Sequence, residues 1–574
     1  MIWVLKFIKK DNFEYWLANI MIIIGSGIAY IIPIALLGDI VDIGIYENNF
    51  SAIPPMFILS ISIFIIGRIL AYFGILLIDN VRFRMADKLK NACYQKLNSL
   101  EEKFYHKNSL GELNTILTTD IHTIHHNMCY VIKQSMSLLI ASILSIIYCL
   151  YINPILTLII LTPTPIIAVL SHKHIKQSNR LYTTQRESLS ELNSYIQENI
   201  EANRLVRSLG TEELEIKEFK EKNRVLKNKN KDIQNLKINY NSKVTFLSYC
   251  MQLLLVLFGG IFVIQGYITI GSFIIMYSFI ERIQKPFIEM SGFINEWQEF
   301  RIAVSKVRKL LETEPKIKKI GEKELSSIKN IDFHNVSVKT ENKLILDNIS
   351  FEMQANQTYA FIGKIGSGKS TIGKLFLRLI EASNGNIKIN NELISEYSLK
   401  SLRNQIGYVS QTPFLFSDTI ANNVAFGKEN LKREDIIKCL KVAKADYVFN
   451  LQNGIDTIIG ENGVSLSGGE KQRLALARAI AIKPSLLILD DITSALDFET
   501  ELEVTNNINN LQYECTKIII AQKILSVKNA DIIFVMKNGK IIEQGSHKEL
   551  LQQNGIYKEI YDIQENSKEA CIWG

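Results

Sequence analysis

The sequence predicts a protein of two parts: a membrane domain of six transmembrane helices with long cytoplasmic extensions, followed by an α/β domain of the P-loop nucleotide-binding class. Long apolar runs alternate with polar segments up to about residue 300. After about residue 316, short apolar strands are separated by helical patterns. A glycine-rich loop follows one of these strands. We therefore expect a membrane domain over residues 1–315, a linker over residues 316–328 and a nucleotide-binding domain over residues 329–574.

Six apolar segments are candidates for crossing a bilayer, which takes about 20 helical residues. They are residues 16–40, 56–78, 131–152, 155–170, 246–268 and 270–293. A buried helix of a soluble protein explains any one of them. It does not explain six such segments with basic residues sorted between them.

Lysine and arginine mark the cytoplasmic side of the predicted bundle. They gather before the first span, after the second and after the fourth, whereas the short loops 41–55 and 153–154 contain none. By the positive-inside rule, both termini, the long connections and the nucleotide-binding domain are cytoplasmic. The net charge of +7 is explained by this topology, so we expect contact with membrane lipid and no nucleic-acid partner.

The two long connections, residues 80–130 and 172–244, have helical periodicity and contain few prolines. We expect the membrane helices to continue through them into the cytoplasm. Each has a candidate break, at residues 106–111 and 186–190, where an intracellular coupling helix would contact a cytoplasmic domain. An ordinary helix-loop-helix explains the periodicity equally well.

Charged residues within the spans mark a candidate substrate cavity. Arg68 lies within the second span, and Glu281, Arg282 and Lys285 lie within the sixth. Charges at membrane depth usually face a bundle interior or a water-filled path. The cavity prediction covers Arg68, Glu281 and Arg282. The alternatives are snorkelling and an internal ion pair between Arg68 and Glu281, and Lys285 fits the membrane interface.

The glycine-rich loop has the spacing G-x-x-x-x-G-K-S between an apolar strand at residues 358–362 and a helical pattern at residues 372–379. Glycines allow backbone N–H groups to turn inward around phosphates, while Lys369 reaches the outer phosphates and Ser370 ligates Mg²⁺. A turn that binds nothing fits this context poorly. The predicted nucleotide ligands are Gly363, Gly366, Ser367, Gly368, Lys369, Ser370 and Thr371.

A second apolar strand, residues 486–490, ends in the carboxylates Asp490 and Asp491. Asp490 is placed to hold Mg²⁺, and Asp491 to orient or deprotonate an attacking water. Ser467 is a candidate N-cap of a helix that begins with Gly468 and Gly469. The N-terminus of this helix is a second anion site. One nucleotide needs one phosphate loop, so the second site indicates a nucleotide held by another domain.

The run Leu-Ser-Gly-Gly-Glu-Lys-Gln-Arg at residues 466–473 resembles the signature of ABC transporters, and it is very specific. The whole chain resembles a half-transporter of the B-type (type IV) exporter class. Other matching segments are residues 111–113, 119–120 and 198–207 (coupling regions), Gln411 (Q-loop), 414–420 (exporter pattern), 460–463 (X-loop) and 494–497 (D-loop).

The resemblance implies that two nucleotide-binding domains sandwich two ATP molecules, each site combining one domain's Walker motifs with the other's signature. It implies ATP and Mg²⁺ as cofactors, and Ser370, Gln411 and Asp490 as the Mg²⁺ site. It also implies that Asp491, Gln522 and Gln411 occupy catalytic positions. Sandwich closure and opening would switch the membrane domains between inward-facing and outward-facing states.

Three residues depart from the family pattern. Asp491 stands where the family has glutamate, Gln522 where it has histidine, and Thr340 where an aromatic ring stacks on adenine. Aspartate is one methylene shorter, and displacing a catalytic group by about 1 Å costs on the order of 100-fold in rate. Glutamine can hydrogen-bond the γ-phosphate but carries no charge there.

Two weakened hydrolytic positions beside an intact signature resemble the degenerate-site subunit of a heterodimeric exporter. The expected partner is a different half-transporter that supplies glutamate and histidine, and the exported cargo is not identified by the sequence. A homodimer with two slow sites and a non-transporting regulatory subunit remain alternatives. A soluble DNA-repair or translation ATPase conflicts with the six spans, and an ABC importer with the exporter-type coupling segments.

Overall fold

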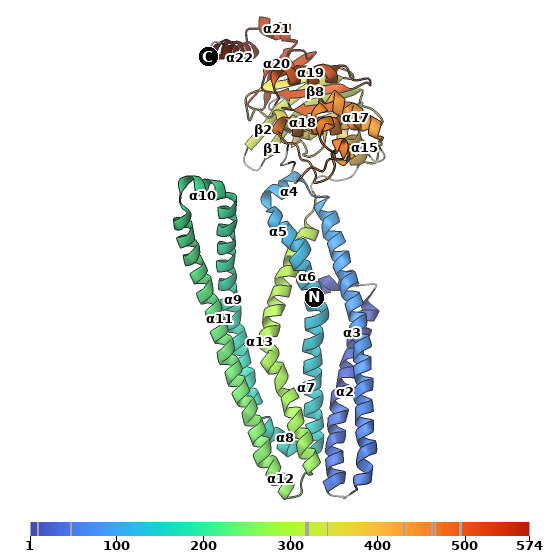
Figure 1. Ribbon diagram of the computed structural model, residues 1–574, viewed down its shortest axis with the longest axis vertical. Helices are drawn as coiled ribbons and strands as arrows, with labels where there is room; N and C mark the ends of the chain where they lie inside the picture. Colours follow the sequence, from blue (N-terminus) through green and yellow to red (C-terminus); the bar gives the residue numbers. More distant parts are fainter. Residues whose placement is uncertain are drawn as a thin grey trace. The chain divides into compact units, whose positions relative to one another are not determined.

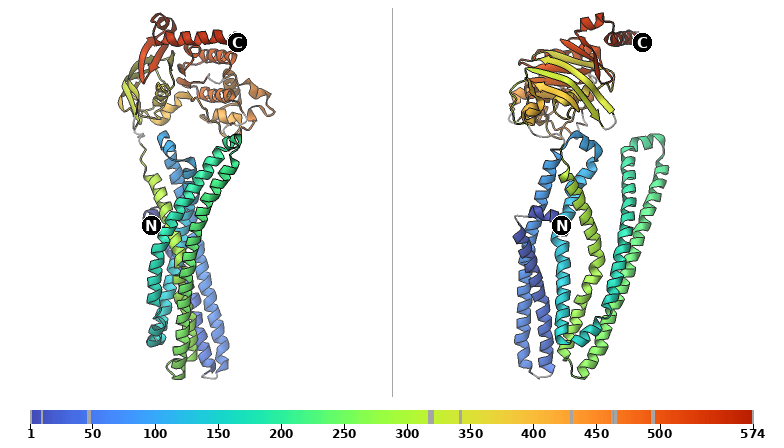
Figure 2. Two further views of the ribbon diagram at one scale, coloured as in Figure 1. Left: turned by 90° about the vertical axis from the view of Figure 1, so that its left-hand side faces the viewer. Right: turned by 180° about the vertical axis from the view of Figure 1, so that it is seen from behind.

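The computed structural model describes residues 2–8, 11–45, 49–315, 321–340, 343–428, 431–460, 463, 466–492 and 496–572. The chain divides into two compact units (Figures 1 and 2). The first contains Met1–Leu100 and Tyr105–Glu314, and the second contains Pro315–Gly574 together with the short segment Glu101–Phe104. Residues 316–320 of the predicted linker lie outside the described residues.

The described residues of the first unit form helices joined by short turns. Its long helices are α2 (Asn12–Ile45), α3 (Ile53–Leu97), α7 (Ile132–Ile152), α9 (Thr164–Glu201), α11 (Glu212–Leu254) and α13 (Ile270–Glu312). Shorter helices and turns are α1 (Ile2–Leu5), η1 (Lys6–Ile8), η2 (Phe50–Ala52), α4 (Glu102–Lys107), α5 (Leu110–Thr115), η3 (Ile116–Asp120), α6 (Ile121–His126), η4 (Asn127–Val131), α8 (Pro154–Ile160), α10 (Asn203–Leu209), η5 (Leu255–Gly259) and α12 (Gly260–Ile264).

Five helical stretches of the described chain are long and apolar enough to cross a membrane. They are Asn12–Gly44, Phe50–Leu97, Leu110–Ile152, Pro154–Glu201 and Glu212–Ile264. The sixth predicted span lies in α13, where Glu281, Arg282 and Lys285 follow one another within five residues. These charges lower the apolar character of α13, so its crossing stays a prediction.

The two breaks predicted in the long connections have different outcomes. The first is present, because α4 ends at Lys107 and Ser109 caps α5 by accepting a hydrogen bond from the Glu112 N–H at 3.2 Å. The second prediction is wrong, because α9 continues without interruption through residues 186–190. The chain turns at α10 instead, where Gly210 adopts a left-handed φ of +64°. Figure 1 shows α9 and α11 side by side, joined at this turn.

Helices α2 and α3 pack side by side through small residues (Figure 2). A Cβ atom added at Gly67 would lie 2.6 Å from the Ala29 nitrogen, and one added at Gly25 would lie 2.6 Å from the Gly67 carbonyl oxygen. Such backbone contact is the usual means of helix association in membranes, where burial of apolar surface gives little driving force.

The second unit contains two β-sheets. The four-stranded sheet has the order β2-β1-β4-β5, and the six-stranded sheet has the order β10-β9-β3-β8-β7-β6. The strands are β1 (Asn330–Thr340), β2 (Lys343–Gln354), β3 (Thr358–Gly363), β4 (Asn384–Ile389), β5 (Glu392–Leu393), β6 (Ile406–Val409), β7 (Leu486–Asp490), β8 (Thr516–Ala521), β9 (Ile532–Lys537) and β10 (Lys540–Gly545).

Helices cover the six-stranded sheet. They are α14 (Lys369–Phe376), α15 (Leu399–Asn404), α16 (Ile420–Ala425), α17 (Arg433–Val442), α18 (Gly468–Ala481), α19 (Phe498–Asn509), α20 (Ile524–Val527), α21 (His547–Gln552) and α22 (Ile556–Ile572), with short turns η6 (Ile394–Glu396), η7 (Asp446–Asn450) and η8 (Gly454–Asp456). All residues of β7 and five of the six in β3 are buried, as expected for central parallel strands.

The parallel arrangement positions the candidate site. Strands β3, β6, β7 and β8 run parallel to their neighbours in this set, so their carboxyl ends meet at one edge of the sheet. Ligands of open α/β sheets bind at this edge. A core cluster rich in phenylalanine, including Phe333, Phe351 and Phe376, joins the two sheets beneath it.

The segment Glu101–Phe104 belongs to the second unit although it precedes that unit by about two hundred residues in the chain. The Lys374 ammonium on α14 donates a hydrogen bond to a Glu102 carboxylate oxygen at 2.8 Å. A segment that continues from α3 therefore contacts the helix that follows the phosphate loop.

We predict that Gly67→Ala forces α2 and α3 apart, because the new methyl group meets backbone atoms that cannot move alone. The expected cost is about 1–3 kcal/mol, seen as a lower thermal melting midpoint of the detergent-solubilised protein. Gly27→Ala is the matched control, because an added Cβ there has nothing within 4 Å. Equal midpoints for the two variants would show that this close approach is unimportant.

Candidate functional site

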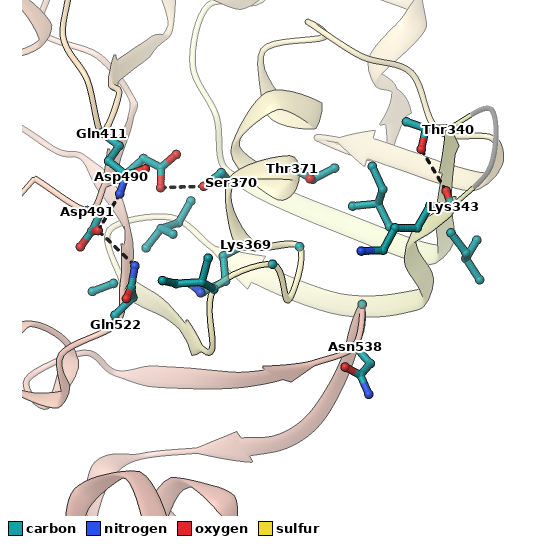
Figure 3. Close-up of a pocket in the computed structure, with 18 residues that line it drawn as sticks. Thr340, Lys343, Lys369, Ser370, Thr371, Gln411, Asp490, Asp491, Gln522 and Asn538 are labelled. Carbon is teal, nitrogen blue, oxygen red and sulfur yellow. Dashed lines mark hydrogen bonds between the residues drawn. The ribbon is translucent and has the colours of Figure 1, made fainter. Parts of the chain in front are cut away.

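A cavity of about 600 Å³ lies at the carboxyl edge of the six-stranded sheet (Figure 3). One end is lined by the polar side chains of Gln411, Asp490, Asp491 and Gln522. Residues of the phosphate loop line it as well. Thr340, Lys343 and Asn538 lie away from these four side chains (Figure 3), and the lining also includes Leu344, Ile345, Ile365 and Gly539. The cavity therefore brings together the predicted Walker residues, which lie far apart in the sequence.

The phosphate loop has the backbone that its glycines allow. Gly366 and Gly368 have φ values of +80° and +101°, in the region that favours glycine. A Cβ at Gly368 would also approach Leu346 Cδ2 to 2.6 Å, and one at Gly363 would approach the Met536 carbonyl oxygen to 2.2 Å. A side chain at these positions would distort the loop.

The Lys369 ammonium lies at the centre of the loop. It donates hydrogen bonds to the carbonyl oxygens of Gly363 at 2.7 Å and Lys364 at 2.9 Å. The residue is only 7% exposed, and burial lowers the pKa of its ammonium, opposed by the carboxylates of Asp491 and Asp490. A phosphate at this position would replace the carbonyl partners with a stronger, charged acceptor.

Asp490, at the end of β7, accepts two hydrogen bonds. Ser370 Oγ donates to one carboxylate oxygen at 3.1 Å, and the Tyr408 hydroxyl donates to the other at 3.2 Å. Burial raises the pKa of Asp490, and the hydrogen bonds from Ser370 and Tyr408 oppose this effect. A hydroxyl and a buried carboxylate this close together are suitable ligands for Mg²⁺.

Asp491 is held by two amides. Gln411 Nε2 and Gln522 Nε2 both donate to the same carboxylate oxygen, Oδ2, at 3.1 and 3.4 Å. The backbone of Asp491 has a φ of +53°, which is uncommon for a residue with a side chain. Its N–H donates to the Ile520 carbonyl oxygen of β8 at 2.8 Å. These contacts direct the side chain toward the phosphate end of the cavity (Figure 3).

The signature residues form a helix cap that is separate from this cavity. Ser467 Oγ accepts a hydrogen bond from the Glu470 N–H, and the Glu470 carboxylate accepts one from the Ser467 N–H at 2.7 Å, which makes a capping box for α18. Ser467 and Gly468 are exposed and Gly469 is buried. None of the three lines the cavity.

Two motifs named from the sequence lie partly outside the described residues. These are residues 461–462 of the X-loop and residues 494–495 of the D-loop.

In the membrane unit, two guanidinium groups converge on one tyrosine. Arg282 lies over the Tyr30 ring at 4.2 Å from its centroid, and Arg68 Nη1 lies 3.4 Å from the Tyr30 hydroxyl. The salt bridges among the described residues do not include one between Arg68 and Glu281. The structure thus assembles Arg68 and Arg282 around Tyr30, which the sequence analysis did not identify.

The membrane unit also has a mostly apolar cavity of about 780 Å³ between α7, α9 and α13. Its lining includes Leu139, Met290, Trp297, Asn179 and Arg301. None of the three predicted cavity residues Arg68, Glu281 and Arg282 lines it. Their role in cargo binding stays a prediction.

Comparison with known proteins agrees with this architecture. Residues 16–287 match the family described as "ABC transporter transmembrane region", and residues 346–494 match the family described as "ABC transporter". The solved "Structure of a bacterial Atm1-family ABC exporter with ATP bound" has a TM-score of 0.84 at 22% identity, covering 96% of this chain and 98% of that one.

Two curated relatives match nearly the whole chain. The "Uncharacterized ABC transporter ATP-binding protein YknU" of Bacillus subtilis (strain 168) is 32% identical over 513 residues, covering 88% of this chain and 87% of the relative. The "ATP-dependent lipid A-core flippase" of Haemophilus influenzae (strain 86-028NP) is 31% identical over 560 residues, covering 94% of each.

The fold and the cavity define a class of protein: a helical membrane domain joined to a P-loop ATPase domain, in the arrangement of type IV exporters. The chain belongs to the ABC transporter family. The predicted fold class and the predicted family are confirmed.

Two residues of the site were missed by the sequence analysis. Tyr408 lies on β6 and donates to Asp490, and Gln472 on α18 donates to the Gln411 carbonyl oxygen at 3.4 Å. Tyr408 lies three residues before Gln411 on the strand that leads to it. The polar side chain of Tyr408 on that strand is the feature of the sequence that could have identified it.

We predict that Tyr408→Phe raises the Mg²⁺ concentration needed for ATP binding, because Asp490 loses one of the two hydroxyls that hold it. One lost hydrogen bond is worth about 1 kcal/mol, or about a fivefold rise in the Mg²⁺ concentration for half-maximal ATP binding. Tyr397→Phe is the control, because its hydroxyl donates to the Ile389 carbonyl oxygen away from the cavity. An unchanged Mg²⁺ requirement in Tyr408→Phe would contradict this role.

Proposed function

We propose that this chain is one half of an ATP-driven exporter and pairs with a different half-transporter. The observation that supports the pairing most directly is the contrast between the two nucleotide elements of the chain. The signature cap at Ser467 is intact, whereas Asp491 and Gln522 occupy the two hydrolytic positions of its own Walker site.

In this proposal, the Walker site binds ATP and hydrolyses it slowly. Ser370, Gln411 and Asp490 hold Mg²⁺, and the loop from Gly363 to Thr371 holds the phosphates. Asp491 is a poor base for two reasons. Its side chain is short, and the amides of Gln411 and Gln522 both donate to its Oδ2, which lowers the basicity of the carboxylate.

The signature helix serves the partner's nucleotide. Ser467, Gly468 and Gly469 do not line this chain's cavity, and the N-terminus of α18 is exposed at Ser467 and Gly468. A helix N-terminus with a serine cap is a suitable anion site. The partner contributes the phosphate loop of that composite site, together with glutamate and histidine at the hydrolytic positions.

The membrane topology in this proposal places both termini and the nucleotide-binding domain in the cytoplasm. ATP binding there closes the two nucleotide-binding domains on each other, and closure switches the membrane domains. The Glu102–Lys374 contact connects the phosphate-loop helix to the chain that continues from α3.

We propose that the cargo is amphipathic and partly anionic. Arg68 and Arg282 converge on Tyr30, the salt bridges among the described residues include neither guanidinium, and one curated relative is named a lipid A-core flippase. Two nearby guanidiniums at membrane depth favour an anionic group between them.

A homodimer with two slow sites is the second candidate. It is favoured by one observation, that Asp491 still presents a carboxylate at the phosphate end of the cavity. A regulatory subunit that moves no cargo is distinguished from both by cargo flux in reconstituted vesicles.

We predict that ATP turnover distinguishes the paired exporter from the homodimer. The chain would be purified alone and with the half-transporter encoded beside it. For the heterodimer, the pair turns over rapidly, Ser467→Ala abolishes turnover, and Asp491→Asn changes it less than about twofold. High turnover by the lone chain, lost in Asp491→Asn, would instead establish the homodimer.

The double variant Asp491→Glu with Gln522→His, purified alone, serves as the reciprocal control in that experiment. It restores the two hydrolytic side chains of the family to a site whose other parts are in place. In the degenerate-site interpretation, it raises the turnover of the lone chain by at least about tenfold, since a displacement of about 1 Å costs on the order of 100-fold.

We predict that Arg68→Ala lowers transport of anionic amphiphiles by about fivefold, the effect of losing about 1 kcal/mol of charge interaction. Transport of neutral amphiphiles changes little, and Arg68→Lys retains most of the activity because the charge remains. Flux measured in vesicles with several cargos tests this. Unchanged flux for all of them removes Arg68 from the cargo site.

A further inference from the structure

The end of the nucleotide cavity farthest from Asp490 and Asp491 is where the base of a bound nucleotide would lie. The outer phosphates belong at Lys369 and Ser370, so a triphosphate extends from there toward Thr340, Lys343 and Asn538 (Figure 3). This inference rests on the proposed nucleotide binding and concerns which base the site accepts.

No aromatic side chain lines this cavity among the described residues. Beside Thr340, the lining includes the aliphatic side chains of Leu344, Ile345 and Ile365, and residues 341–342, a glutamate and an asparagine in the sequence, lie outside the described residues. The nearest aromatic residue along β1, Phe333, is 1% exposed and stacks on Phe351 in the core. The base therefore has aliphatic contacts in place of a stacking platform.

The polar groups at this end include one that favours a 6-oxopurine. The Thr340 hydroxyl donates to the Lys343 carbonyl oxygen at 3.1 Å and keeps lone pairs that accept, and the Asn538 amide has both donors and an acceptor, so neither excludes adenine or guanine. The Lys343 ammonium is exposed, and the salt bridges and hydrogen bonds among the described residues give it no partner. An ammonium has only donors, so it suits the paired O6 and N7 acceptors of guanine better than adenine, where an amino group takes the place of O6 beside N7.

We propose that the P-loop site of this chain does not select adenine and binds 6-oxopurine nucleoside triphosphates, such as GTP and ITP, at least as tightly as ATP. The phosphate loop supplies most of the affinity. Lys343 is the residue that determines the preference at the base.

The test is equilibrium competition on the full-length chain in lipid nanodiscs, with Mg²⁺ and a fluorescent methylanthraniloyl-ATP probe. ATP, GTP, ITP and UTP are the competitors. We expect the concentrations of GTP and ITP that displace half of the probe to be equal to or below the corresponding concentration of ATP. A preference for ATP over GTP of tenfold or more in the unaltered chain would overturn the inference.

Three variants locate the effect. Lys343→Met weakens binding of GTP and ITP by about three- to tenfold more than it weakens binding of ATP, whereas Lys339→Met, at an exposed lysine on the same hairpin that does not line the cavity, leaves the GTP-to-ATP ratio as it is. Thr340→Tyr tightens every competitor by about tenfold or more, because stacking on an aromatic ring accepts any base. An unchanged GTP-to-ATP ratio in Lys343→Met, or unchanged affinities in Thr340→Tyr, would show that the base lies elsewhere and overturn the inference.

Failure of this inference differs from failure of the proposed function. If all nucleotides bind and ATP is preferred, only the base preference is wrong. If neither the probe nor any competitor binds, and Lys369→Ala gives the same binding signal as the unaltered chain, nucleotide binding itself is absent and both proposals are overturned.

Discussion

The nucleotide site depends on one constraint, that the carboxyl ends of parallel strands meet at one edge of a sheet. Strand β3 leads into the phosphate loop, β6 leads to Gln411, β7 ends at Asp490, and β8 ends one residue before Gln522. Each strand fixes the direction of the residue that follows it. Groups separated by 80 to 120 residues are thereby held within hydrogen-bond distance.

The two adjacent aspartates at this edge have different surroundings. Asp490 is 4% exposed and accepts hydrogen bonds from two hydroxyls, which suits a group that binds a cation. Asp491 is less buried, has a left-handed backbone and accepts from two amides. Proton abstraction and metal binding require different surroundings for a carboxylate. The surroundings of Asp490 fit metal binding more clearly than those of Asp491 fit proton abstraction.

Features set by local spacing could be predicted from the sequence. The phosphate loop, the strand ending in Asp490 and the cap at Ser467 each follow from residues close together in the chain. Periodicity alone places the turn after α9 too early in the chain. Residues 186–190 contain no helix breaker, whereas Gly210 is one and ends α10. The contacts of Tyr408 with Asp490, and of Arg282 with Tyr30, join distant segments, and nothing in a local pattern specifies them.

The contact between Glu102 and Lys374 has a consequence for how the chain can be divided. The compact nucleotide-binding unit includes four residues encoded about two hundred positions upstream of its main body. A domain expressed from residue 315 onward lacks these residues, and the α14 surface that they cover becomes exposed to solvent. The compact unit that holds the nucleotide site is therefore discontinuous in the sequence, and the ATP affinity of a fragment that starts at residue 315 need not equal that of the whole chain.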